Sequence, residues 1–136
     1  MVCLGNICRS PLAEGILREK TKDLDVHTDS AGTSAYHVDD APDLRSIQIA
    51  RKYNINISDL RGRQFSVEDF DNFDKIYVMD RSNYNNVLQL ARNEEDRAKV
   101  DLILNEIEPY SNAEVPDPYY GGDQGFENVY KMLDVA

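Results

Sequence analysis

The chain has 136 residues, enough for one domain with its own hydrophobic core, and its 41% hydrophobic and 29% charged residues exclude a disordered protein. The net charge of −10 argues against nucleic acid or an anionic membrane as the main partner. Because no apolar run approaches the length of a membrane span and no hydrophobic signal segment follows Met1, we expect a cytoplasmic protein.

The first part of the chain predicts two helices separated by a short strand and a loop. Apolar residues fall on one face of a helix over 11–22, with Pro11 as its first residue. A strand is expected over 26–30 and a loop over 34–40. A second helix is expected over 42–54, with proline at its start and asparagine at its end.

Helices and strands also alternate in the rest of the chain. The sequence predicts, in order, a short helix from a Ser66–Asp69 capping box through Phe70, a strand over 75–80, a helix over 82–92, a strand over 99–104, a loop over 110–125 and a final helix over 126–135. This alternation is typical of a parallel sheet with helices on both faces, so we expect a three-layer α/β fold. Ligands of such sheets bind at the carboxyl ends of the strands.

The stretch from Cys3 to Pro11 has the composition of an anion-binding loop. Gly5 and Asn6 tolerate positive φ, so the backbone between Cys3 and Arg9 can curl into a ring whose N–H groups point inward. The helix that follows would direct its positive N-terminal end at the same place. We therefore predict a site for a phosphate-sized anion, with the Cys3 thiol at its floor.

Three side chains have the chemistry that phosphoryl transfer needs. The loop amides, Arg9 and the helix end favour the thiolate form of Cys3, and the Ser10 hydroxyl can donate a hydrogen bond to it. Arg9 carries a planar fork that suits two phosphoryl oxygens at once. The leaving oxygen needs a proton, and Asp117, held extended by a proline on each side, is the candidate donor. A simple turn aspartate is the alternative for Asp117.

The other candidate residues have two interpretations each. Cys8 is either a small buried side chain or a redox partner. Tyr36, Tyr119 and Tyr120 either wall a slot for an aromatic substrate or are exposed loop tyrosines. With two cysteines and two histidines, the chain has neither a disulfide framework nor the spacing of a zinc site.

Two motifs together resemble the low-molecular-weight protein tyrosine phosphatase family. They are Val-Cys-Leu-Gly-Asn-Ile-Cys-Arg-Ser-Pro over 2–11 and the distant Asp117-Pro-Tyr-Tyr. Further matches, in order, are Asp29-Ser-Ala-Gly, Arg63-Gln64, Val78-Met-Asp80 with Ser82-Asn83, and Phe126-Glu-Asn-Val-Tyr130. The resemblance implies a four-stranded parallel sheet in the order 2-1-3-4, a phosphate-binding loop at the carboxyl end of the first strand, and no metal or cofactor.

The resemblance also implies a protein tyrosine phosphatase that works through a cysteinyl-phosphate intermediate. Cys3 attacks phosphorus, Arg9 and the loop amides hold the phosphoryl oxygens, and Asp117 protonates the leaving phenol and then assists water. The phosphate-binding amides are those of Leu4, Gly5, Asn6, Ile7, Cys8 and Arg9. The supporting residues are Ser10, Ser30 and Asp80. Ser10 and Ser30 would hold Asn6 in its left-handed conformation. Asp80 would support Arg9 or simply cap a helix.

The same resemblance makes Tyr36, Tyr119 and Tyr120 the substrate walls, and Cys8 a cysteine that can form a disulfide with an oxidised nucleophile. The implied partners are a tyrosine-phosphorylated protein, with a bacterial-type tyrosine kinase as one candidate, and phosphate or sulfate in the loop. The protein is expected to be a monomer or a weak dimer.

The chain departs from the family at three places. Only Met1 and Val2 precede Cys3, and the last helix ends early, so we expect a single domain over residues 1–136 that is short at both ends. Leu60 stands where some relatives have a histidine in the loop network.

Three other functions compete with a tyrosine phosphatase. Arsenate reductases share the fold and loop but need further cysteines, which this chain lacks. A protein arginine phosphatase of the same fold tends to carry threonine at the place of Ile7. From another class, the chain could be a non-catalytic phosphate-binding module or an inactive truncated form.

Overall fold

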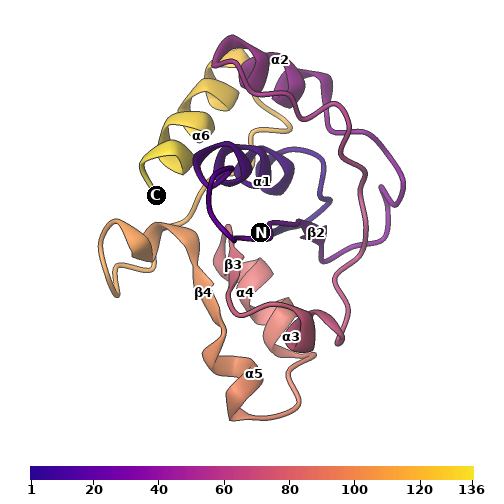
Figure 1. Cartoon of the computed structure of the whole chain (residues 1–136), viewed down its shortest axis with the longest axis vertical. Coiled ribbons are helices and arrows are strands. Elements are labelled where there is room, and N and C mark those ends of the chain that lie inside the picture. Colours follow the sequence, from indigo (N-terminus) through magenta and orange to yellow (C-terminus); the bar gives the residue numbers. More distant parts are fainter.

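Four short parallel strands form the central sheet, in the order β2-β1-β3-β4 (Figure 1). The computed structural model describes residues 1–136. The strands are β1 (Val2–Cys3), β2 (Ala31–Gly32), β3 (Ile76–Val78) and β4 (Val100–Leu102). Val2 of β1 pairs with Ala31 on one side and Val78 on the other. The predicted parallel sheet and its strand order are confirmed, with Cys3 as the last residue of β1.

Helices cover both faces of this sheet. They are α1 (Arg9–Lys20), α2 (Leu44–Lys52), α3 (Asp69–Asn72), α4 (Arg81–Leu88), α5 (Glu94–Ala98), the 3₁₀ helix η1 (Ile103–Glu106) and α6 (Asp123–Val135). The elements α1, α2 and α6 lie on one side of the strands, and α3 and α4 on the other (Figure 1). No helix combines the length and the apolar character that crossing a membrane requires.

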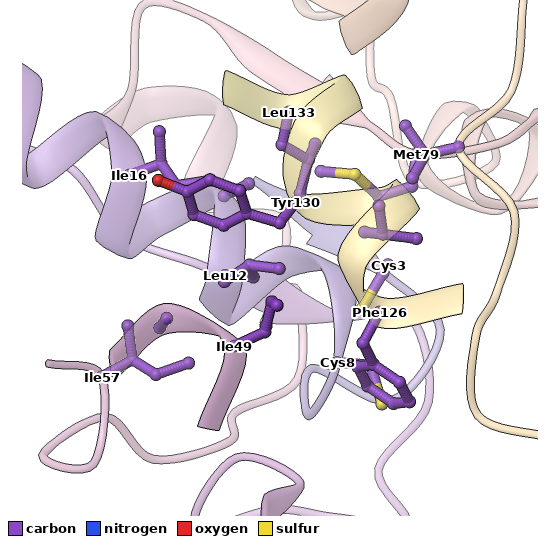
Figure 2. Close-up of a cluster of buried hydrophobic side chains, with 14 of the residues drawn as sticks. Cys3, Cys8, Leu12, Ile16, Ile49, Ile57, Met79, Phe126, Tyr130 and Leu133 are labelled. Atoms are coloured by element: carbon purple, nitrogen blue, oxygen red, sulfur yellow. The ribbon is translucent and has the colours of Figure 1, made fainter. Parts of the chain in front are cut away.

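Successive residues of β1 point into different hydrophobic cores, because side chains alternate along a strand. Val2 and Val78 belong to the smaller core, under α3 and α4. Cys3 points into the larger core, between the sheet and α1, α2 and α6. Figure 2 shows Cys3 and Cys8 in this larger cluster, together with Phe126 of α6. The first strand and the loop that follows it are therefore anchored by burial on both faces.

Two predicted boundaries near the loop are wrong. The first helix begins at Arg9, so Pro11 is its third residue and not its first. Proline is still tolerated there, because the N–H groups of the first helical turn have no intrahelical partner. The strand predicted over 26–30 is instead Ala31–Gly32, because the Ala31 N–H donates to Met1 O and the Thr33 N–H to Cys3 O. Pairing with the short β1, and not side-chain propensity, sets the position of β2.

Boundaries also differ in the second half of the chain. The helix predicted over 82–92 ends at Leu88, and α5 follows from an Asn93 cap that was not predicted. The Ser66–Asp69 capping box is only half formed: the Asp69 carboxylate accepts the Ser66 N–H, and α3 begins at Asp69 itself. The final helix begins three residues early, at Asp123.

Candidate active site

The loop between β1 and α1 is shaped by Asn6, which has a left-handed backbone with φ of 59°. Its side-chain amide donates to Ser10 Oγ at 2.7 Å and to Ser30 Oγ at 2.9 Å. Its Oδ1 accepts the Arg63 N–H at 3.1 Å. Every polar atom of this buried side chain is therefore paired, which offsets the cost of positive φ in a residue other than glycine.

Cys3 lies at the floor of this loop, with its sulfur 3.1 Å from Ser10 Oγ. Ser10 Oγ accepts a hydrogen bond from Asn6, and its own hydrogen can be donated to the sulfur or, over the longer distance of 3.5 Å, to the Ala31 carbonyl. Ser10 is the second residue of α1, so the thiol lies at the positive end of that helix. This surrounding favours a nucleophilic sulfur.

Arg9 is almost fully buried, with 2% of its surface exposed, and is held on one side of its guanidinium. Nη1 donates to Asp80 Oδ2 at 2.6 Å and to the carbonyl of Val115 at 3.0 Å. Asp80 also accepts the Asn83 N–H at 2.8 Å at the start of α4, so one carboxylate both holds Arg9 and caps a helix. The remaining guanidinium nitrogens, Nε and Nη2, make no hydrogen bond within the protein, and Nη2 lies 3.6 Å from the Asp117 carboxylate.

Asp117 comes from the loop before α6, 108 positions after Arg9 in the chain. Its Oδ2 lies 3.6 Å from Arg9 Nη2, and its Oδ1 accepts the Tyr119 N–H at 3.0 Å. The carboxylate therefore stands beside the guanidinium.

These groups share one cavity of about 280 Å³. It is lined by Cys3, Leu4, Gly5, Ile7, Cys8, Arg9, Ser34, Tyr36, His37, Asp117, Tyr119 and Tyr120. A larger hollow of about 460 Å³ between α2 and α6 contains neither a cysteine nor a buried charged side chain. The chemistry therefore belongs to the smaller cavity.

Comparison with known proteins identifies the family. The model of the low molecular weight phosphotyrosine protein phosphatase family matches residues 1–136. The chain belongs to this family.

Individual relatives agree with the family assignment. The chain is 45% identical to a candidate low molecular weight protein-tyrosine-phosphatase of Synechocystis, over 99% of this chain and 88% of that protein. A protein tyrosine phosphatase from Entamoeba histolytica, with Hepes in its active site, superimposes with a TM-score of 0.89 at 36% identity, covering 98% and 86% of the two chains. The tyrosine phosphatase Wzb of Escherichia coli K30, in complex with sulphate, gives a TM-score of 0.84 at 32% identity, covering 98% and 87%.

All three predicted walls of this phosphatase cavity line it, but at different depths. Tyr119 is 39% exposed, whereas Tyr36 and Tyr120 are 88% and 93% exposed and stand at the mouth. His37 was not predicted: its Nδ1 is 3.0 Å from Asp40 Oδ2, and its ring lies against Gly5, where an added Cβ would be 3.0 Å from Cδ2. Its loop has no periodic pattern, so the sequence contains no signal for this contact.

Cys8 is a free thiol with a raised pKa, whereas a nucleophilic cysteine needs a lowered one. Burial, followed by the negative charges of Asp43, Cys3 and Asp117, raises the pKa of Cys8 to about 12. Cys3 and Cys8 are both unpaired and buried. At neutral pH the Cys8 thiol is therefore protonated, which is consistent with a packing role in the larger core.

A buried carboxyl group supports the loop from below and was also not predicted. Glu14 Oε1 accepts the Ser30 hydroxyl at 2.6 Å, and Ser30 in turn accepts from Asn6. Burial raises the pKa of Glu14 above its ordinary value of 4.5, although the hydrogen bond from Ser30 acts in the opposite direction. The folded protein thus holds a proton on Glu14 at a pH where the unfolded chain has lost it.

We expect Glu14→Gln to become more stable relative to the natural protein as pH rises from 4.5 towards 7. The folded natural protein binds more protons than the unfolded chain in this window, so its free energy of unfolding falls with increasing pH. Glutamine stays neutral and its carbonyl oxygen can still accept from Ser30. Urea unfolding of both proteins across this range measures the difference, and a difference independent of pH would contradict the argument.

Proposed function

We propose that this chain removes phosphate from phosphotyrosine in proteins through a cysteinyl-phosphate intermediate. The observation that carries the proposal is that the Cys3 thiol, the Arg9 guanidinium and the Asp117 carboxylate face one cavity. Aromatic side chains at its mouth suit the phenyl ring of the substrate. The cavity therefore offers a nucleophile, an anion receptor and a proton donor to the same phosphate ester.

The first step is proposed to be attack of the Cys3 sulfur on phosphorus. The bond between phosphorus and the tyrosine oxygen breaks, and the protonated Asp117 gives its proton to that oxygen. Arg9 Nη2 and the N–H groups of residues 4–9 hold the three equatorial oxygens as charge spreads over them. The fixed contacts of Arg9 with Asp80 and Val115 mean that this receptor needs little rearrangement.

The second step returns the enzyme to its starting state. The ionised Asp117 takes a proton from water, the water oxygen attacks phosphorus, and the bond between phosphorus and the Cys3 sulfur breaks. Inorganic phosphate leaves, and Asp117 is protonated again for the next cycle. Ser10, which lies 3.1 Å from the sulfur, is proposed to stabilise the thiolate as it departs.

The remaining roles follow from contacts around the loop. We propose that Ser10 and Ser30 support the phosphate-binding loop through Asn6, and that Asp80 supports it through Arg9. Cys8 is proposed as the redox partner of an oxidised Cys3. The high pKa of Cys8 slows the attack of its sulfur on Cys3, because the thiolate is the attacking form.

The substrate is proposed to be a tyrosine-phosphorylated protein, with a bacterial-type tyrosine kinase as one candidate. The E. coli relative is in complex with sulphate, and we propose the loop over residues 4–9 of this chain as a site for phosphate or sulfate. A cytoplasmic location, a monomer or weak dimer, and a single domain over residues 1–136 are also proposed; the two free thiols suit a reducing compartment.

The test of the function is turnover of a phosphotyrosine peptide by the natural protein and by Asp117→Asn. Asparagine cannot donate the proton, so we expect kcat/KM to fall by about 10²–10³-fold for phosphotyrosine and by less for 4-nitrophenyl phosphate, whose leaving group needs less help. Turnover of a phosphoarginine peptide, measured in the same assay, distinguishes a tyrosine phosphatase from the alternative arginine phosphatase. The apolar Ile7 in the cavity favours the phenyl ring of phosphotyrosine. Absence of turnover by the natural protein would leave only a phosphate-binding module.

A further inference from the structure

The segment that contains Asp117, Pro116–Gly122, is exposed except at Pro118, and it follows Val115, whose N–H donates to the Met79 carbonyl at 2.8 Å. Within Pro116–Gly122, the hydrogen bonds made locally are Gly121 N–H to Pro118 O, Tyr119 N–H to Asp117 Oδ1 and Gly125 N–H to Gly122 O. The ion pair with Arg9 at 3.6 Å is too long to fix an orientation. A proton donor needs a defined position, so a further part of the molecule has to hold the exposed residues that follow Asp117.

That part is Arg45, the second residue of α2. Its Nη2 donates to the Tyr119 carbonyl at 2.9 Å and its Nη1 to the Gly121 carbonyl at 3.1 Å. Apart from the bond of Gly122 to the adjoining helix α6, these are the only hydrogen bonds that join the Pro116–Gly122 segment to another element of the fold. The main chain of Tyr119 therefore connects the two residues: its N–H donates to the Asp117 carboxylate, and its carbonyl accepts from Arg45.

The Arg45 guanidinium is itself fixed from two directions. Its Nε and Nη2 donate to the two carboxylate oxygens of Asp43, at 3.1 and 3.2 Å. Its central carbon lies 4.6 Å from the centre of the Phe126 ring and 5.6 Å from that of Tyr119. A guanidinium with paired donors and aromatic contacts has one preferred orientation, which a lysine ammonium would not have.

The same group is connected to the phosphate-binding loop. The Asp43 N–H donates to the Ile7 carbonyl at 2.7 Å, and the Ser46 hydroxyl of α2 donates to the Cys8 carbonyl at 3.2 Å. The start of α2 thus contacts the loop that holds the nucleophile, while Arg45 contacts the loop that holds the proton donor.

We propose that Arg45 is a positioning residue that sets the place of Asp117 relative to Cys3. Arg45 touches neither the substrate nor the reacting atoms; it acts through the carbonyl oxygens of Tyr119 and Gly121. This inference rests on the proposed function, in which Asp117 is the general acid. Loss of Arg45 should impair proton donation without removing the anion receptor.

The test compares phenyl phosphate, whose leaving phenol is as weakly acidic as tyrosine, with 4-nitrophenyl phosphate, whose leaving group needs little protonation. We expect Arg45→Met to lower kcat/KM about 30-fold for phenyl phosphate and less than about threefold for 4-nitrophenyl phosphate. Arg45→Lys keeps a positive charge but can replace only part of the fork, so an intermediate loss is expected. Arg51→Met is the matched control, because Arg51 is an exposed residue of the same helix whose side chain makes no hydrogen bond.

A double-mutant cycle separates positioning from a merely structural effect. In an Asp117→Asn background, Arg45→Met should change either rate by less than about twofold, because no proton donor is left to misplace. Inhibition by inorganic phosphate should be unchanged. Equal losses on both substrates, or a loss that persists with Asp117→Asn, would overturn the inference while the proposed function stands. No turnover by the natural protein would overturn both.

Discussion

Cys3→Ser is expected to lower kcat/KM for any phosphate ester by at least about 10⁴-fold, because the nucleophile itself is lost. The sulfur lies at the N-terminal end of α1 and 3.1 Å from the Ser10 hydroxyl. A serine hydroxyl is a much weaker nucleophile than a cysteine sulfur, so it cannot replace Cys3 in the attack on phosphorus. The measurement is steady-state turnover of 4-nitrophenyl phosphate and of a phosphotyrosine peptide.

Binding of phosphate separates loss of chemistry from loss of the site. Arg9 and the loop amides, and not the sulfur, are proposed to hold the oxygens, so Cys3→Ser should bind inorganic phosphate at least as well as the natural protein. Acid-quenched mixtures with labelled substrate should contain a phosphoprotein for the natural protein and none for the variant. Residual turnover of more than a tenth by the variant would show that another group attacks phosphorus.

The phosphate-binding loop was predictable from the sequence because its determinants are contiguous. Asn6 has a side chain that tolerates positive φ, and Arg9 and Ser10 begin the helix that follows directly. Asp117 was found by its two flanking prolines and the family motif. Its approach to Arg9 depends on the whole topology: the alternation of helices and strands indicated a parallel sheet, and the family resemblance implied the strand order.

The partners of these residues were less predictable because many are main-chain atoms. The Val115 carbonyl that holds Arg9 and the Tyr119 and Gly121 carbonyls that bind Arg45 have no signature in the sequence. The position of β2 was missed for a related reason. A strand of two residues has no period, and Gly32 is required by proximity, since an added Cβ would be 2.9 Å from the Leu4 carbonyl oxygen.

Arg9→Lys is expected to lower kcat/KM by at least about 10³-fold, although the charge is kept. The arginine uses Nη1 for Asp80 and the Val115 carbonyl, while Nη2 faces the cavity beside Asp117. A lysine has one nitrogen at the end of its chain. If that nitrogen pairs with Asp80, it cannot also meet two phosphoryl oxygens in the plane that the fork provides. Phosphate affinity should fall together with turnover.

Stability distinguishes the two functions of Arg9, binding of substrate and neutralisation of Asp80. The Asp80 side chain is only 21% exposed, so Arg9→Met leaves a half-buried carboxylate without its cation and should cost about 1–3 kcal/mol of unfolding free energy. Arg9→Lys keeps a cation beside Asp80 and should cost less. Urea unfolding, measured beside the turnover assays, should show that both variants are inactive but differ in their free energy of unfolding. Equal stability would mean that the hydrogen bond from Asn83 is sufficient for Asp80, and that the buried pair serves catalysis alone.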